Sequence, residues 1–239
     1  MLPPETDDLW TFLKDQPALE AFILVGGTAL ALQISHRRSE DLDFAYPQSR
    51  LPGPRLEALR LVASQSGFEF TPDEDESAIH EFADSTLELH DYQQDFLVNG
   101  KMKISFFVPA APMLKVLGRQ SAPKPRVATL PELFKTKCLV SALRSKTRDW
   151  LDLYVLLHDH GFSIRDFADA FREAGVENQC SAALARLCSG TPQADDEGYS
   201  HLLSNPPSLE EMRAFFVAQR DRLEIEAAAE VARRKKSGK

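Results

Sequence analysis

The pattern of apolar and polar positions changes character along the chain. The first half alternates short apolar runs, typical of buried strands, with segments of helical periodicity. Strands are expected at 21–25, 42–46, 68–70, 78–82, 86–92, 95–98 and 101–108, and helices at 6–16, 28–36 and 54–67. Thr6 is expected to cap the first helix. Asn99 and Gly100, between the last two runs, favour a type I′ hairpin turn.

The second half is expected to be helical. Thr129 with Glu132, and Ser208 with Glu211, have the spacing of capping boxes. Thr147 and Ser163 are expected to open two further helices. The fold class predicted is α/β (α+β), a mixed sheet flanked by helices and followed by a helical region. The expected divisions are 1–110 for the α/β core, 111–128 for a Pro-rich, basic linker or wrapped loop, and 129–239 for the helical region that completes the site.

Composition narrows the class of protein. With 239 residues, 43% hydrophobic and 27% charged, the chain can bury a sizeable core. The net charge of −8 argues against a broad nucleic-acid-binding surface and leaves room for a local basic patch. No apolar run approaches the roughly 20 residues of a membrane span, and no secretory signal is visible. The three cysteines lack metal-ligand spacing, so a cytoplasmic protein with reduced thiols is expected.

Two acids stand in an otherwise apolar strand. Strand alternation places Asp41 and Asp43 on the same face. Carboxylates held this close repel each other unless a cation lies between them. Mg²⁺ (or Mn²⁺) suits such a pair, because it is usually bound by one or two carboxylates together with substrate phosphates and water. The pair is therefore a candidate metal site.

A glycine turn lies just upstream of the acids. Gly26 and Gly27 allow backbone N–H groups at a helix start to face an anion, and Thr28 adds a hydroxyl. Arg37 and Ser39 are placed to reach phosphate oxygens. Alone, a Gly-Gly pair is usually a turn, and an Asp-x-Asp pair is usually a solvated edge or loop. Their conjunction is more specific and predicts a site for a nucleoside triphosphate (NTP).

The stretch "GGTALALQISHRRSEDLDF" resembles the signature of the nucleotidyltransferase superfamily, and in particular the AbiEii/AbiGii-type nucleotidyltransferase toxins. A second block, at 137–157, resembles the downstream motif of the same family. The residues that match it are Lys137, Arg144, Arg148, Asp149, Asp152 and Leu153. Together the two blocks extend the resemblance over roughly residues 17–160.

The resemblance implies transfer of a nucleoside monophosphate (NMP) from an NTP to an acceptor hydroxyl, with an RNA such as tRNA as the acceptor. It also implies a toxin of a toxin–antitoxin or phage-defence pair, and hence a cognate antitoxin protein. Catalytic roles fall to Asp41, Asp43, Lys137 and Asp149, with Lys137 also a partner of the nucleotide phosphates. On periodicity alone, Lys137 equally fits a side chain that extends to solvent. Asp152 is expected to be structural, with Arg144 or Arg148 as its partner.

One position departs from the superfamily pattern. A third acid usually follows on a later strand, and the in-phase residue here is Ser105. Glu88 or Asp91 is a possible substitute, or Asp149 takes over its role. The departure keeps two alternatives open: a catalytically degenerate nucleotide-binding module, and a small-molecule nucleotidyltransferase of the antibiotic-modifying type. The best candidate for an acceptor-binding patch is the basic segment 115–126 with Lys101 and Lys103, although a solvated loop is an equal alternative.

Overall fold

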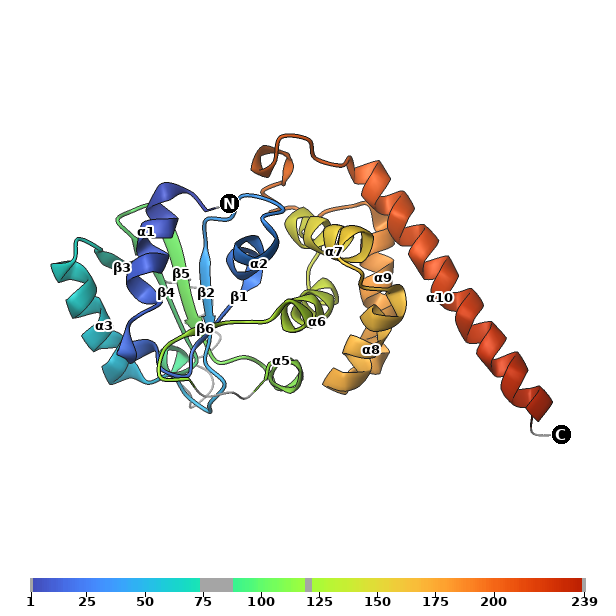
Figure 1. The fold of residues 1–239 in the computed structure, drawn as a ribbon, viewed down its shortest axis with the longest axis horizontal. Coiled ribbons are helices and arrows are strands. Elements are labelled where there is room, and N and C mark those ends of the chain that lie inside the picture. The colour runs from blue at the N-terminus through green and yellow to red at the C-terminus, as the bar shows by residue number, and fades with distance from the viewer. Residues whose placement is uncertain (1, 74–87, 119–121, 238–239) are drawn as a thin grey trace. The chain divides into compact units, whose positions relative to one another are not determined.

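A computed structural model describes residues 2–73, 88–118 and 122–237 of the chain (Figure 1). It contains two compact units, Met1–Leu133 and Phe134–Lys239. The predicted strand at 78–82, and the first part of that at 86–92, lie outside the described residues. Among the residues that are described, no helix is long and apolar enough to cross a membrane.

The first unit is built on a six-stranded mixed sheet in the order β3-β4-β5-β2-β1-β6. Its strands are β1 (Ile23–Val25), β2 (Leu42–Ala45), β3 (Phe70–Pro72), β4 (Gln93–Val98), β5 (Met102–Phe107) and β6 (Arg126–Val127). Strands β2 and β5 run parallel, as do β1 and β6, and the other neighbours are antiparallel. The predicted mixed sheet is thereby confirmed.

The two faces of the sheet differ. Phe44, Phe96 and Phe106 point to a buried face, where α1 (Pro4–Leu13) and α3 (Gly53–Gln65) pack. The ring of Trp10 from α1 lies 6.3 Å from Phe44, and the Arg60 guanidinium from α3 lies 5.0 Å from the ring centroid of Phe96. Helix α2 (Gly26–Ile34) lies against β1 and β2. Because side chains alternate along a strand, the residues next to these phenylalanines in each strand point to the opposite, more open face.

Several local predictions need correction. Helix α1 starts at Pro4, so Thr6 does not cap it; Thr6 is buried inside the helix and donates to the Glu40 carbonyl at 3.3 Å. The 3₁₀ turns η1 (Pro17–Leu19) and η2 (Leu89–Asp91) were not expected, and η2 occupies part of the predicted strand at 86–92.

The expected linker at 111–128 contains regular structure. It holds helix α5 (Ala111–Val116) and strand β6, whose backbone pairs with β1 in parallel. Proline and basic residues are frequent in this segment, so it lacks the apolar pattern of a strand. A strand at the edge of a sheet pairs through its backbone N–H and C=O groups, and β6 can therefore form without that pattern. The hairpin prediction is confirmed nearby: Asn99 and Gly100 have φ of 51° and 67°, and the Lys101 N–H donates to the Val98 carbonyl at 3.1 Å.

The second unit is helical, as predicted. Helix α6 (Leu130–Ser141) starts in the first unit and continues into the second. The following elements are α7 (Thr147–Asp159), α8 (Ile164–Ala174), η3 (Glu177–Gln179), α9 (Cys180–Ser189), η4 (Ser200–Leu202) and α10 (Leu209–Ser237). Phe167 and Phe171 of α8, with Phe216 of α10, are among its largest fully buried side chains.

The predicted caps of three helices are confirmed. Glu132 accepts from the Thr129 N–H at 2.7 Å, Ser163 and Asp166 form a reciprocal box, and Glu211 accepts from the Ser208 N–H at 2.6 Å. Thr147, in contrast, is the first residue of α7 and not its cap.

Glu132 joins three segments of the first unit, and its carboxylate should stabilise their arrangement. Burial opposes its charge, but the Arg126 guanidinium and the N–H groups of Thr129 and Gly118 outweigh that effect and hold the pKa of Glu132 at about 2. We expect Glu132→Gln to lower the free energy of unfolding at pH 7 by about 2 kcal/mol, after allowance for solvent screening.

The pH dependence tests the cause. The native protein should lose this contribution as the pH falls from about 4.5 towards 2, whereas Glu132→Gln should not. Urea denaturation across this range measures the difference. Glu57→Gln is the control, because it removes an exposed carboxylate that lies 3.0 Å from the half-buried Arg60. Parallel pH curves for the native protein and Glu132→Gln would contradict the explanation.

Candidate active site

The glycine turn brings α2 against the strand that carries the acids. Gly26 has a φ of +74°, and a Cβ atom there would overlap Oδ2 of Asp43. A Cβ atom on Gly27 would overlap Nη2 of Arg37 and lie 3.0 Å from Oγ of Ser39. The backbone of Gly26 therefore favours glycine, and a side chain on Gly27 would displace the Arg37 guanidinium; Asp43, Arg37 and Ser39 all lie against the first turn of α2.

Thr28 holds the segment before β2 in place. Its side chain is fully buried, and its hydroxyl donates to the Asp41 carbonyl and lies 3.0 Å from the Ser39 hydroxyl. These partners belong to the protein itself, so the hydroxyl links α2 to the segment that carries Asp41. Direct contact between Thr28 and phosphate stays a prediction.

The strand expected at 42–46 is β2, and the shared face that alternation predicts for Asp41 and Asp43 stays a prediction. Asp43 lies in β2, Asp41 immediately precedes this strand, and both side chains are half-buried. In the part of the chain that the structure describes, no group of three or more His, Cys, Asp or Glu residues is arranged to hold a metal ion. A pair of carboxylates beside an anion-binding turn still fits Mg²⁺, since phosphates and water commonly complete its shell.

Arg37 adds positive charge to this turn. Its residue is only 6% exposed, its Nη1 donates to the Arg38 carbonyl at 2.9 Å, and Nη2 lies against Gly27. The N-terminus of a helix carries a partial positive charge as well. The guanidinium and the helix terminus therefore attract the same kind of ligand, an anion.

Ser105 lies where the sequence placed it. In the parallel pair of β2 and β5 it is the direct partner of Asp43. Neither predicted substitute belongs to a strand: Glu88 is exposed and precedes η2, and Asp91 lies in η2, where it pairs with Arg50 at 2.7 Å. A further acid, Asp95 of β4, lies opposite Ser105 on its other side. Sequence reasoning missed Asp95, because the strand pairing that places it there is not visible in local periodicity.

In the second unit, Lys137 lies between two aspartates. Its Nζ is 2.7 Å from Oδ1 of Asp149 and 2.6 Å from Oδ2 of Asp152. All three residues are buried, so the alternative of a lysine that extends to solvent is excluded. Asp152, for which Arg144 or Arg148 was the expected partner, pairs with Lys137, because α6 and α7 bring the ammonium between both carboxylates.

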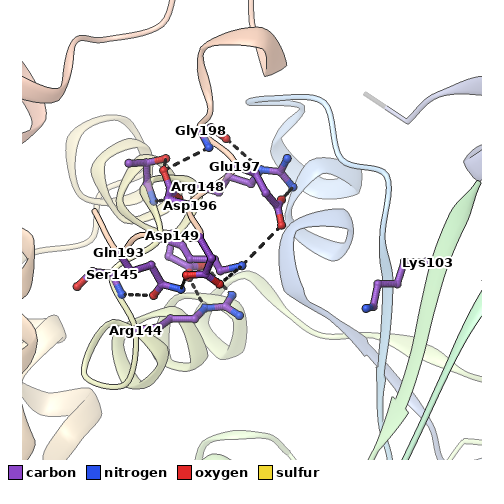
Figure 2. Close-up of polar contacts among 12 residues, drawn as sticks. Lys103, Arg144, Ser145, Arg148, Asp149, Gln193, Asp196, Glu197 and Gly198 are labelled. Atoms are coloured by element: carbon purple, nitrogen blue, oxygen red, sulfur yellow. Dashed lines mark hydrogen bonds and ion pairs between the residues drawn. The ribbon is translucent and has the colours of Figure 1, made fainter. Parts of the chain in front are cut away.

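Arg144 completes this network from the turn before α7. Its Nε donates to Oδ2 of Asp149 at 2.7 Å, and Figure 2 shows the two side chains converging. Burial alone would raise the pKa of Asp149, but Lys137 and Arg144 outweigh it and hold the pKa below its ordinary value. Asp149 is therefore a stable anion and a weak base at neutral pH.

A distant loop caps α7. The Asp196 carboxylate accepts from the Thr147 N–H at 2.9 Å and from its hydroxyl at 2.7 Å, and the Gln193 side chain accepts from the Ser145 N–H at 2.9 Å. Figure 2 shows this loop beside the turn from Ser145 to Arg148. Asp149 lies in the first turn of α7, so the loop helps to set where its carboxylate lies. The sequence does not reveal this cap, because 49 residues separate Thr147 from Asp196.

We expect Asp196→Ala to lower the free energy of unfolding by about 1–2 kcal/mol, as the loss of a helix cap usually does. Urea denaturation at pH 7 measures the change. The control is Glu224→Ala, whose exposed carboxylate lies 3.9 Å from Arg220 on the surface of α10 and should contribute much less. Equal losses in the two variants would show that the cap itself is not the cause.

The predicted acceptor-binding patch is largely neutralised. Lys103 pairs with Asp73 at 2.9 Å and Lys124 with Asp15 at 2.7 Å. Arg126 pairs with Glu132 at 2.8 Å, and Lys101 lies 3.8 Å from Glu5. Asp73, Asp15 and Glu5 come from distant parts of the chain, whereas Glu132 lies six residues after Arg126. The described part of this basic run is therefore less positive than its sequence indicates.

Comparisons with known proteins identify the family of the chain. A family model described as "Nucleotidyl transferase AbiEii toxin, Type IV TA system" matches residues 7–235. An uncharacterised protein of Aquifex aeolicus (strain VF5) is 25% identical over 196 residues, which are 82% of this chain and 84% of that protein.

Two solved structures resemble the fold. JHP933 from Helicobacter pylori is 17% identical, with a TM-score of 0.51 and coverage of 98% of this chain and all of its own. The nucleotidyltransferase toxin MenT4 from Mycobacterium tuberculosis H37Rv is 15% identical, with a TM-score of 0.50 and coverage of 92% of this chain and 86% of its own. With the family match across nearly its whole length, the chain belongs to the AbiEii nucleotidyltransferase toxin family.

Proposed function

We propose that this protein is a Mg²⁺-dependent nucleotidyltransferase that moves NMP from an NTP to an acceptor hydroxyl, with RNA, in particular tRNA, as the acceptor. It acts as the toxin of a toxin–antitoxin or phage-defence pair. The observation that carries the proposal is the close approach of Asp43 and Arg37 to the first turn of α2, where Gly26 has a φ of +74° and a Cβ on either glycine would meet one of these side chains. This approach supports an anion-binding turn beside the proposed metal-binding carboxylates.

Each residue of this turn has a separate task. The backbone N–H groups at the start of α2, together with Arg37, hold the triphosphate. Asp41 and Asp43 would hold Mg²⁺ or Mn²⁺, which when bound offsets negative charge on the phosphate oxygens. Thr28 and Ser39 keep the Asp41 segment against α2, since their hydroxyls lie 3.0 Å apart and Thr28 also bonds the Asp41 carbonyl.

Lys137 and Asp149 are proposed to serve the same reaction. Lys137 pairs with the nucleotide phosphates, and Asp149 orients the Lys137 ammonium from 2.7 Å away. The lowered pKa of Asp149 favours this orienting role over removal of a proton from the acceptor. Three points stay predictions: that transfer requires Lys137, that the protein has a cognate antitoxin, and that it is cytoplasmic.

The test is direct transfer of label. The full-length protein is incubated with Mg²⁺, total tRNA and each of four α-³²P-labelled nucleotides in turn. Label in RNA that disappears in Asp43→Ala supports the proposal. Nucleotide binding without transfer to any acceptor would favour a degenerate binding module, the reading that Ser105 motivates. Label on a small alcohol or amine, and none on RNA, would instead select a small-molecule acceptor.

A further inference from the structure

An acidic side chain lies one strand beyond the missing third acid. Asp43 of β2 pairs with Ser105 of β5, and Ser105 pairs with Asp95 of β4. Residues that face one another in a sheet point to the same side, so all three side chains lie on the open face. Two strand spacings, about 10 Å, separate the backbones of Asp43 and Asp95. The short Ser105 side chain between them leaves room for a substrate group.

Asp95 has capacity for a further hydrogen bond. Its Oδ2 accepts from the Gln93 amide at 2.7 Å, but its Oδ1 is buried and has no hydrogen-bond partner. A buried carboxylate oxygen that lacks a donor is unfavourable, and such atoms call for an explanation. A hydroxyl group of a bound acceptor would supply the missing donor.

The space beside Asp95 is large enough for such a group. A cavity of about 570 Å³ is lined by Asp95, Asp73, Gln93, His90 and Lys103, among others. The hydrogen bond to Asp73 raises the pKa of Lys103 against the effect of burial, and the charges of Asp95 and Asp41 raise it further. Asp41 and Asp95 therefore lie within electrostatic reach of the same ammonium, on one continuous face.

We propose that Asp95 is the base that accepts the proton of the acceptor hydroxyl. It would replace the third acid of the superfamily, whose position Ser105 occupies. The inference rests on the proposed function. The acceptor oxygen forms a bond to the α-phosphorus as the bond from that phosphorus to pyrophosphate breaks. The hydroxyl proton passes to Asp95, and pyrophosphate leaves. Among the described residues no three acids are close enough to bind one metal, which fits a proton acceptor better than a third metal ligand.

The test uses the full chain, with saturating labelled nucleotide and total tRNA. Asp95→Asn should lower the transfer rate by about 10²-fold or more, the usual contribution of a general base. Its affinity for the nucleotide should stay unchanged, because Asp95 serves the acceptor and not the triphosphate. The matched control is Asp73→Asn, which removes a carboxylate from the same cavity and should retain most of the transfer rate.

A second variant separates chemistry from structure. Adding Ser105→Asp to Asp95→Asn places a carboxylate beside Asp43 and should restore about tenfold or more of the lost rate. A damaged fold would not be repaired by this change.

Full transfer by Asp95→Asn would overturn the inference and leave the proposed function standing. So would a loss that Ser105→Asp fails to rescue, or an equal loss in nucleotide affinity. A native protein that labels no acceptor would overturn both.

Discussion

Replacing Asp43 by asparagine is expected to reduce nucleotide transfer by about 10³-fold or more, since a metal that stabilises transition-state charge contributes several kcal/mol. Asn keeps the size of the side chain against Gly26 and removes its charge. The variant should therefore fold, bind Mg²⁺ and nucleotide more weakly, and transfer little label. Single-turnover transfer to tRNA, with nucleotide binding followed by calorimetry, measures both effects.

The control lies one residue before Asp41. Glu40→Gln removes an exposed carboxylate that pairs with the exposed Arg38 at 3.0 Å, so transfer should be nearly unchanged. Asp41→Asn should behave like Asp43→Asn. Thermal unfolding of all three variants checks the fold. Transfer that survives in both Asp variants would show that the carboxylate pair is not the metal site.

The second large effect is expected at Lys137. Lys137→Met leaves Asp149 and Asp152 buried without their shared cation, and breaking a buried pair in this way typically costs about 3–5 kcal/mol. Urea denaturation at pH 7 should show a loss of this size. Arg144 also pairs with Asp149, but its side chain is 49% exposed. Arg144→Gln should therefore lower the free energy of unfolding much less.

The pH dependence of that loss identifies its cause. In the native protein the pKa of Asp149 is lowered, so its stabilising contribution is present above its unfolded pKa of about 3.9 and is lost as the pH falls through the folded value. Without Lys137, burial favours the protonated form, so the variant gains stability as the pH falls. The two proteins should therefore approach each other towards pH 4. A difference that does not change with pH would contradict an electrostatic cause.

Local patterns predicted the elements well and their partners poorly. Asn99 and Gly100 form the predicted turn, because their conformational preference needs no distant contact. The boxes at Thr129 and Ser163 form for the same reason, since three residues separate the bonded groups. Thr6 and Thr147 have the same capping chemistry, but α1 begins before Thr6 and α7 begins at Thr147, so neither residue is in the capping position. Packing against the rest of the chain sets these starts.

The basic run at 115–126 shows why charge along a sequence is a weak guide to surface charge. Lys124 and its partner Asp15 are 109 residues apart, so no window of the sequence contains both. Asp195 and Asp196 are neighbours of the same residue type, but the Thr147 hydroxyl at the start of α7 donates to Asp196. The sequence alone does not show which of the two has this role.

The sequence by itself determined the glycine turn and Ser105 as the in-phase residue, and it predicts a shared face for Asp41 and Asp43. Each follows from backbone geometry within one or two elements, which alternation and turn preferences specify. Only the tertiary structure decided that Asp95 lies beside Ser105 and that Lys137 lies between Asp149 and Asp152. Strand order and helix packing set those partners. Both depend on the joint burial of apolar residues from the whole chain, and no local segment specifies them.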